Sequence, residues 1–391
     1  MRNVYLDYSA TTPVKEEVVQ AMIPYFTEKF GNPSTLYGPG LEAKAGLDKA
    51  RKQVADLIGA EDREIFFTSC GTEADNWVIE GVADALRSKG NHIITTKIEH
   101  HAILHTCQYL EKHGVEVTYL DVDNEGFVDP ADLEAAIKDN TILVSIMMVN
   151  NEVGTIQPIK ELCAIAKKHG VLFHTDTVQA LGNIPIDVKD LGVDFISMSA
   201  HKIYGPKGIG ALYKRAGINI PSFVHGGAQE KKKRAGTENT AGIVGFGKAA
   251  ELAMQNLPEH AAHSDKLRRM LWEKIEQTIP DITLNGPKDF TKRHPGNLNI
   301  SFSYIEGESI ILLLDSYGIC ANTGSACSSG SLGTSHVLEA IGVPITKANG
   351  AIRFTVGDFT TEEDIEYVAE SVKAIVERLR ELSPVNGAEG W

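Results

Sequence analysis

The chain has 391 residues, of which 42% are hydrophobic and 23% are charged, and its formal net charge is −14 at pH 7. This composition is that of a folded globular protein and excludes a disordered or fibrous chain. Because the excess charge is acidic, no chain-wide basic field exists to attract nucleic acid. The apolar run from Ile310 to Leu314 is far shorter than the roughly 20 residues of a membrane span. We therefore expect neither a nucleic-acid partner nor a membrane partner.

The N-terminus and the cysteines indicate the compartment. Residues 1–8 carry charge at Arg2 and Asp7 and lack the apolar core of an export signal, so we expect a cytoplasmic protein. The five cysteines are Cys70, Cys107, Cys163, Cys320 and Cys327. Their odd number, without a paired CxxC spacing, favours reduced thiols over a disulfide framework or a metal site. Cys320 ends an apolar segment and is expected in the core, and a reactive thiol is compatible with this set.

Apolar, strand-like runs alternate with helical periodicity between residues 15 and 255. The expected strands are 64–67, 92–95, 115–120, 142–149, 171–174, 195–198 and 210–213. Between them, 133–137 and 162–166 have the spacing of amphipathic helices. This rhythm is typical of βα units with right-handed crossovers. It predicts an α/β fold in which a mostly parallel, seven-stranded sheet is covered by helices.

The pattern changes after about residue 260. We expect a charged helix over 263–278, strands over 297–302 and 352–356, and a closing helix over 361–382, whose Thr-Thr-Glu-Glu start is a good capping sequence. These elements predict a smaller α+β domain. The predicted division is a large domain over 15–255 and a small domain formed by 1–14 and 256–391.

Lys202 lies just past the apolar run 195–198, at the C-terminal end of a predicted strand. Open α/β sheets bind their ligands at that edge, and a lysine there can form a Schiff base with a carbonyl cofactor. Taken alone, a solvated surface lysine is the better interpretation of this residue. Other segments are needed to favour the cofactor.

The segment that ends at Asp176 favours the cofactor, because Asp176 lies at the end of another apolar strand. Pyridoxal phosphate needs an anion beside its ring nitrogen, since the protonated ring is the electron sink that stabilises a carbanion. Gln179 can bond the phenolic oxygen of the ring. Asp176 alone could equally cap the following helix, so the pairing of Asp176 with Lys202 at two strand ends is what favours the cofactor.

A phosphate group also needs a cradle. Residues 66–74 form a strand, a turn of small residues and the start of a helix, where free N–H groups and the positive end of the helix dipole favour anions. Gly71 and Thr72 are candidates to bind the phosphate there, with Ser199 and His201 as further donors. An ordinary βα turn is the alternative, and the signal is weak by itself.

Seven segments together resemble the cysteine desulfurases, which are pyridoxal-phosphate enzymes of fold type I in the class V aminotransferase group. These segments are 5–13, 30–34, 99–100, 150–154, 174–179, 199–208 and 325–329. The similarity runs from residue 3 to about 383, with the motifs in the order found in the family. The chain is most similar to the subgroup that serves iron–sulfur cluster assembly, whose cysteine lies in a mobile Ser-Ala-Cys loop.

The resemblance implies a role for each matching residue. Lys202 would bind the cofactor covalently, while Asp176 and Gln179 contact its ring and His100 stacks on it and transfers protons. The phosphate would be held, beside Gly71, by Thr72, Ser199, His201 and a Thr237 that arrives from the second subunit of a homodimer. Asn151, also beside the cofactor, and Arg353 would hold the substrate carboxylate, which suits the planar fork of arginine.

The implied reaction converts L-cysteine to L-alanine. The thiolate of Cys327 would attack the substrate sulfur and carry it as a persulfide to an iron–sulfur scaffold or another acceptor protein. An ordinary aminotransferase or a selenocysteine lyase on the same scaffold is the first alternative, although a transaminase needs no nucleophilic thiol. A catalytically idle binding protein is the second, and the joint presence of Lys202, Asp176, His100 and Cys327 argues against it.

Four positions depart from the usual pattern of the family: Cys70 stands for glycine, Tyr37 for histidine, Ala235 for serine and Asp358 for arginine. None of these changes removes a group that the chemistry requires. Side chains alternate along the predicted strand that ends near Val356, so Arg353 and Asp358 fall on opposite faces. We therefore expect Asp358 to lie outside the substrate site.

Overall fold

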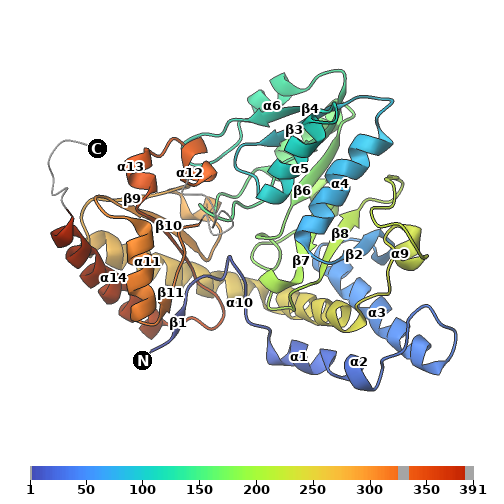
Figure 1. The fold of residues 1–391 in the computed structure, drawn as a ribbon, viewed down its shortest axis with the longest axis horizontal. Helices are drawn as coiled ribbons and strands as arrows, with labels where there is room; N and C mark the ends of the chain where they lie inside the picture. The colour runs from blue at the N-terminus through green and yellow to red at the C-terminus, as the bar shows by residue number, and fades with distance from the viewer. Residues whose placement is uncertain (1, 325–333, 384–391) are drawn as a thin grey trace.

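The computed structural model describes residues 2–324 and 334–383 and is centred on a seven-stranded sheet (Figure 1). Its strands are β2 (Ile65–Thr68), β3 (His92–Thr96), β4 (Glu116–Leu120), β5 (Thr141–Ser145), β6 (Leu172–Asp176), β7 (Phe195–Ser199) and β8 (Gly210–Lys214). The order is β2-β8-β7-β6-β5-β3-β4. Neighbours from β7 to β4 are parallel, and only β8 runs antiparallel to its two neighbours. The predicted mostly parallel sheet is confirmed.

Helices cover both faces of this sheet. They include α3 (Gly38–Leu57), α4 (Gly71–Ala85), α5 (His101–Glu111), α6 (Pro130–Ala136) and α7 (Ile159–Lys168). Adjacent residues of β7 separate the two faces: Phe195 packs in one cluster with Trp77 of α4, and Ile196 packs in the other with Leu47 of α3. Burial on both faces explains why the strands are continuous apolar runs. It also explains why the predicted strand over 142–149 was too long, since residues beyond Ser145 stay buried after β5 ends.

The C-terminal part has its own sheet and core. Three antiparallel strands are ordered β12-β10-β9: β9 (Ile282–Leu284), β10 (Asn297–Phe302) and β12 (Ala351–Thr355). They pack with α11 (Gly307–Ser316) and α14 (Glu362–Leu382), which begins at a capping box of Thr361 and Asp364. The N-terminal strand β1 (Val4–Tyr5) pairs with β11 (Ile319–Cys320) beside them. The two ends of the chain therefore share one core.

One long helix, α10 (Thr240–Thr278), joins the two parts of the molecule (Figure 1). The predicted start at residue 263 was wrong, because the helix begins 23 residues earlier at a side-chain cap from Asn239. Pro258 lies inside the helix at an exposed position. A proline removes one backbone hydrogen bond, but here the helix continues because both of its ends are packed, the first half against α3.

The remaining helices are short: α1 (Glu16–Met22), α2 (Pro24–Thr27), α8 (Val188–Leu191), α9 (Gln229–Lys232), α12 (His336–Ala340) and α13 (Ile345–Ala348). Within the described ranges, no helix is long and apolar enough to cross a membrane. The expectation that Cys320 is a core residue was wrong, because its thiol is exposed. In the two-residue strand β11, Ile319 points inward, and the alternation of side chains turns Cys320 to solvent.

Candidate active site

Lys202 and Asp176 meet at the carboxyl edge of the large sheet, as predicted. Asp176 is the last residue of β6, and Lys202 ends a short 3₁₀ turn directly after the neighbouring strand β7. The ammonium group of Lys202 donates to the carbonyl oxygens of Ser9 and Ala10 (2.8 Å to Ala10). The side-chain amide of Gln179 donates to the same Ser9 carbonyl at 3.0 Å. The N-terminal segment thus crosses the strand ends and brings these side chains to one point.

The floor of this site is acidic. Burial raises the pKa of Asp176 to about 6, even though the Val178 amide and Lys202 favour its charged form. Burial also raises the pKa of Glu99 to about 8, and burial together with Asp176 raises the pKa of Asp75. Several buried carboxyls cannot all ionise without a cation nearby. Lys202 supplies one such cation, and a protonated ring nitrogen next to Asp176 would supply a second.

His100 caps the N-terminus of α5. Its Nδ1 accepts the N–H of Ala102 at 3.1 Å, which places the hydrogen of the neutral ring on Nε2. Burial, followed by the charge of Lys202, lowers the pKa of His100 to about 4. The ring is therefore neutral at neutral pH and has an N–H to donate. It can accept a proton on Nδ1 only if it gives up the helix cap.

The predicted phosphate cradle has the required open groups. No side chain caps the N-terminus of α4, which begins at Gly71. The hydroxyl of Ser199 is buried and lacks a hydrogen-bond partner among the described residues. A Cβ atom on Gly71 would lie 2.6 Å from the Val178 side chain, so only glycine fits there. His201 faces the Thr11 hydroxyl at 3.1 Å, and burial lowers its pKa to about 4. These features fit a phosphate group.

Arg353 forms the opposite end of the site. Its guanidinium is buried and donates to the carbonyl oxygen of Asn151 at 2.9 Å and to the carboxylate of Asp7 at 2.7 Å. Its Nε atom is buried and lacks a partner in the part of the chain that the structure describes. Sequence reasoning predicted Arg353 and Asn151 but missed Asp7. The only signal for Asp7 was its place in segment 5–13, the first of the segments that resemble the family, since its partner lies 346 residues away.

Comparison with known proteins identifies the family of this chain. Residues 4–368 match the family model described as aminotransferase class-V. The chain is 56% identical over 384 residues to the cysteine desulfurase IscS of Clostridium botulinum, which covers 98% of this chain and 97% of that protein. It is 55% identical to the IscS of Methanosarcina thermophila, with coverage of 99% and 95%. The chain belongs to the cysteine desulfurases of the class-V aminotransferase family.

Solved structures of similar proteins support the same family assignment. A NifS-like protein superposes on this desulfurase with a TM-score of 0.91 and 41% identity, covering 97% of this chain and all of that one. A structure of SspA in complex with cysteine gives a TM-score of 0.80 and 34% identity, covering 92% of this chain and all of that one. The predicted fold type I and the predicted pyridoxal-phosphate-dependent cysteine desulfurase are confirmed.

Cys327 lies outside the described residues, but both flanks of its segment are placed. A Cβ atom on Gly324 would lie 3.1 Å from a carboxylate oxygen of Glu152, and the Ser335 hydroxyl donates to that same oxygen at 2.5 Å. The His336 ring then bonds the carbonyl oxygen of Glu99 at 3.0 Å. The two flanks thus meet beside Glu152, which adjoins Asn151, and close to the helix that His100 caps.

The other predicted positions lie at the edges of the desulfurase site. Thr72 is exposed on the first turn of α4, and Thr237 is exposed on the loop before α10, where it lines a cavity of about 80 Å³ with Ser69. Asp358 forms ion pairs with Lys15 and His260 and so turns away from Arg353, as the strand alternation predicts.

Cys70 and Tyr37 are N-cap residues of α4 and α3 without side-chain caps, and Ala235 is buried.

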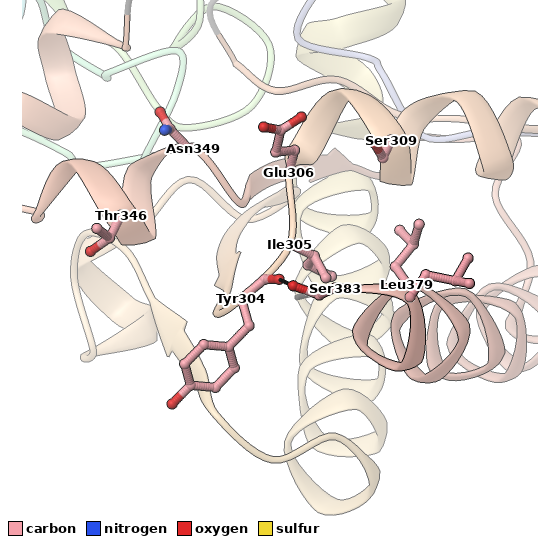
Figure 2. Close-up of a pocket in the computed structure, with 9 residues that line it drawn as sticks. Tyr304, Ile305, Glu306, Ser309, Thr346, Asn349, Leu379 and Ser383 are labelled. Carbon is pink, nitrogen blue, oxygen red and sulfur yellow. Dashed lines mark hydrogen bonds between the residues drawn. The ribbon is translucent and has the colours of Figure 1, made fainter. Parts of the chain in front are cut away.

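A larger cavity lies elsewhere. It has a volume of about 360 Å³ and opens between α11, α13 and the end of α14 (Figure 2). Its lining residues include Tyr304, Glu306, Asn349 and Leu379. None of the predicted site residues lines it, so this cavity is separate from the candidate site.

Proposed function

We propose that this desulfurase binds its cofactor through Lys202 and carries the sulfur of L-cysteine on Cys327. The observation that supports this assignment most directly is the placement of Lys202 and the buried Asp176 at two adjacent strand ends, near enough for the charge of Lys202 to favour the ionised form of Asp176. Pyridoxal phosphate, when bound, withdraws electrons from the α-carbon of the substrate. The remaining steps belong to side chains of this chain.

The cofactor is held from three sides in this proposal. Asp176 holds the proton of the ring nitrogen, Gln179 donates to the phenolic oxygen, and the neutral His100 packs on the ring. The phosphate is bound by the first N–H groups of α4, beginning at Gly71 and Thr72, and by Ser199 and His201. The open helix end and the unpaired Ser199 hydroxyl support this arrangement.

The carboxylate of the substrate binds between Arg353 and Asn151. The Nε–H of Arg353 is available for it, because Nε has no partner among the described residues, and each terminal nitrogen keeps a second hydrogen beside its bond to Asn151 or Asp7. A hydrogen bond between charged groups contributes about 1.5 to 3 kcal/mol. Asp7 orients the guanidinium rather than binding the substrate.

The thiolate of Cys327 then attacks the sulfur of the bound cysteine. The S–S bond forms as the C–S bond breaks, and the electron pair of the broken bond goes to the substrate carbon, which takes up a proton and becomes the methyl group of alanine. The Nε2–H of His100 is available to supply a proton at the ring face. The placement of Gly324 and Ser335 beside Glu152 supports the approach of the Cys327 segment to this site.

We also propose a homodimer in which Thr237 of one subunit contacts the phosphate of the other. Support comes from the exposure of Thr237 and from apolar side chains that α1 to α3 and their connections leave in solvent. They are Ile23, Phe26, Phe30, Leu36, Tyr37 and Leu41. Exposed apolar groups that cluster along one part of a chain are typical of an interface.

Three further proposals concern the setting of the enzyme. The sulfur acceptor is an iron–sulfur scaffold or another acceptor protein, and the compartment is the cytoplasm, where the four described free thiols would stay reduced. The chain is divided into domains over 15–255 and over 1–14 with 256–391. Leu6 packs in one hydrophobic cluster with Leu267 and Phe354, which supports the assignment of residues 1–14 to the smaller domain.

Borohydride reduction and mutation test these assignments. Reduction of the cofactor-loaded protein should attach the cofactor to Lys202, and attachment to another lysine would refute the assignment. Cys327→Ala should keep the spectral response to cysteine and lose sulfide release. Cys320→Ala is the matched control, because Cys320 is exposed and lies only seven residues before Cys327 but outside the Ser-Ala-Cys motif, and it should retain activity. Sulfide release by Cys327→Ala would move the role to another thiol, first to Cys70.

A further inference from the structure

A second polar cluster lies behind Lys202 and is built around Tyr204. The backbone N–H of Asp358 donates to the Tyr204 hydroxyl at 2.7 Å, and the N–H of Lys15 donates to the Tyr204 carbonyl at 3.1 Å. The ammonium group of Lys15 contacts the Asp358 carboxylate and lies 4.7 Å from the centre of the Tyr204 ring. The backbone of Tyr204 has a φ of 63°, a value that residues other than glycine rarely adopt. Two distant segments, those of Lys15 and Asp358, therefore hold this strained residue, which lies two positions after Lys202.

His260 of α10 completes the cluster. Its Nδ1 contacts the Asp358 carboxylate, and its Nε2 lies 2.9 Å from the amide oxygen of Asn183. The orientation of that amide is set, because its nitrogen donates to the carbonyl oxygens of Gln179 and Leu181, each at 3.2 Å. Both ring nitrogens of His260 therefore face acceptors. Only a ring that carries hydrogen on both nitrogens can donate to both.

The pKa of Asp358 is consistent with its contacts to Lys15 and His260. Burial alone would raise the pKa of Asp358, but the contacts with His260 and Lys15 outweigh burial and lower it to about 2. The carboxylate is therefore ionised where it contacts Lys15 and the His260 ring. Such a partly buried set of charges is stable only while each member keeps its partners.

The cluster also borders the proposed attachment lysine. His260, Asp358 and Lys202 line one small cavity of about 20 Å³. Asp358 follows β12, the strand that carries Arg353. The segment that binds the substrate carboxylate and the segment that bears Lys202 are thus joined through Asp358 and Tyr204.

We propose that His260, Asp358 and Lys15 are positioning residues that hold the Lys202 segment in register with the substrate site, with His260 in its doubly protonated form. The proposal rests on the proposed role of Lys202. Arg353 has its own contacts with Asp7 and Asn151, so loss of the cluster should misplace Lys202 without weakening the binding of the carboxylate. The expected signature is a lower kcat with an unchanged KM for cysteine.

The first test compares Asp358→Asn with a matched control, Glu362→Gln. Glu362 pairs with Lys266 and also joins α10 to the segment after β12, but at the exposed surface. Asp358→Asn should lower kcat about tenfold and leave KM within about twofold of the wild type, and Glu362→Gln should change neither. His260→Gln keeps the pair of Lys15 and Asp358, and it should likewise lower kcat and leave KM unchanged. If Asp358→Asn does not fold, the kcat and KM of His260→Gln test the proposal.

The second test needs no activity. In the cofactor-free protein, ring ¹⁵N spectra should show hydrogen on both nitrogens of His260, and Asp358→Asn should remove this signature. A singly protonated ring in the wild type would overturn the proposal, as would a wild-type kcat in both variants. Failure of borohydride to label Lys202 in the wild type would instead refute the proposed function and would leave the ring spectra unaffected.

Discussion

The two ends of the proposed active site, the cofactor end and the carboxylate end, are built in different ways. The cofactor end comes from the carboxyl edge of the large sheet, where Asp176 and Lys202 each follow a buried strand. The carboxylate end joins Arg353 to Asn151 and Asp7, which lie 202 and 346 residues away in the chain. The first end depends on local strand–turn patterns, and the second depends on how the C-terminal part packs against the N-terminus. This difference makes the two ends separable by mutation.

Asp176→Asn should have the largest effect on turnover. The variant keeps the shape of the side chain but removes the anion beside the ring nitrogen, and loss of one preorganised electrostatic contact typically costs about a hundredfold or more in kcat. Steady-state rates of alanine formation measure the loss. A kcat within a few-fold of the wild type would mean that the ring nitrogen lies elsewhere, and the comparison of the two ends would fail.

Arg353→Ala should act on binding instead. Loss of a charge-assisted hydrogen bond of about 1.5 to 3 kcal/mol raises the KM for cysteine by roughly 10- to 100-fold. Asp358→Ala serves as the neighbouring control, since Asp358 pairs with Lys15 and His260, and its KM should barely change. Equal shifts in KM for the two variants would show that Asp358 also reaches the substrate carboxylate.

Asp176→Asn should also change the stability of the cofactor-free protein. Although the substitution lowers turnover, it should raise stability. Burial raises the pKa of Asp176 from 3.8 to about 6. A raised carboxyl pKa stabilises the folded state at low pH, and this contribution is lost as the pH rises through about 6. Asparagine cannot ionise, so the variant should unfold at a higher temperature than the wild type above pH 6. The difference in melting temperature should shrink below about pH 4, and a difference independent of pH would contradict the assignment of this pKa.

The same contrast between local and distant contacts explains which elements and site residues could be predicted from the sequence and which were missed. Apolar runs located all seven strands of the large sheet, and the strand ends located Asp176 and Lys202. The start of α10 was missed because Pro258 interrupts its pattern, although packing keeps the helix intact. Asp7 and His260 were missed because their partners are 346 and 98 residues away. No local spacing reports such contacts.

The loop that carries Thr237 offers the smallest and most local test. Glu230, Lys231 and Lys232 have φ values of 44°, 58° and 66° in succession. Each such residue is strained by about 1 kcal/mol or more. A buried ion pair compensates, because the Glu230 carboxylate accepts two hydrogen bonds from Arg51 at 2.7 Å and one from the Phe67 amide at 2.9 Å.

Lys232→Gly should therefore stabilise the protein. Glycine adopts a positive φ without strain, and the gain is only partly offset by its greater freedom in the unfolded chain, so the free energy of unfolding should rise by about 0.5 to 1 kcal/mol. Lys288→Gly is the matched control, since Lys288 is exposed but lies outside the set of positive-φ residues, and it should destabilise. Urea unfolding of the two variants measures both changes. Equal loss of stability in both would mean that the Arg51–Glu230 pair does not hold Lys232 in a strained backbone.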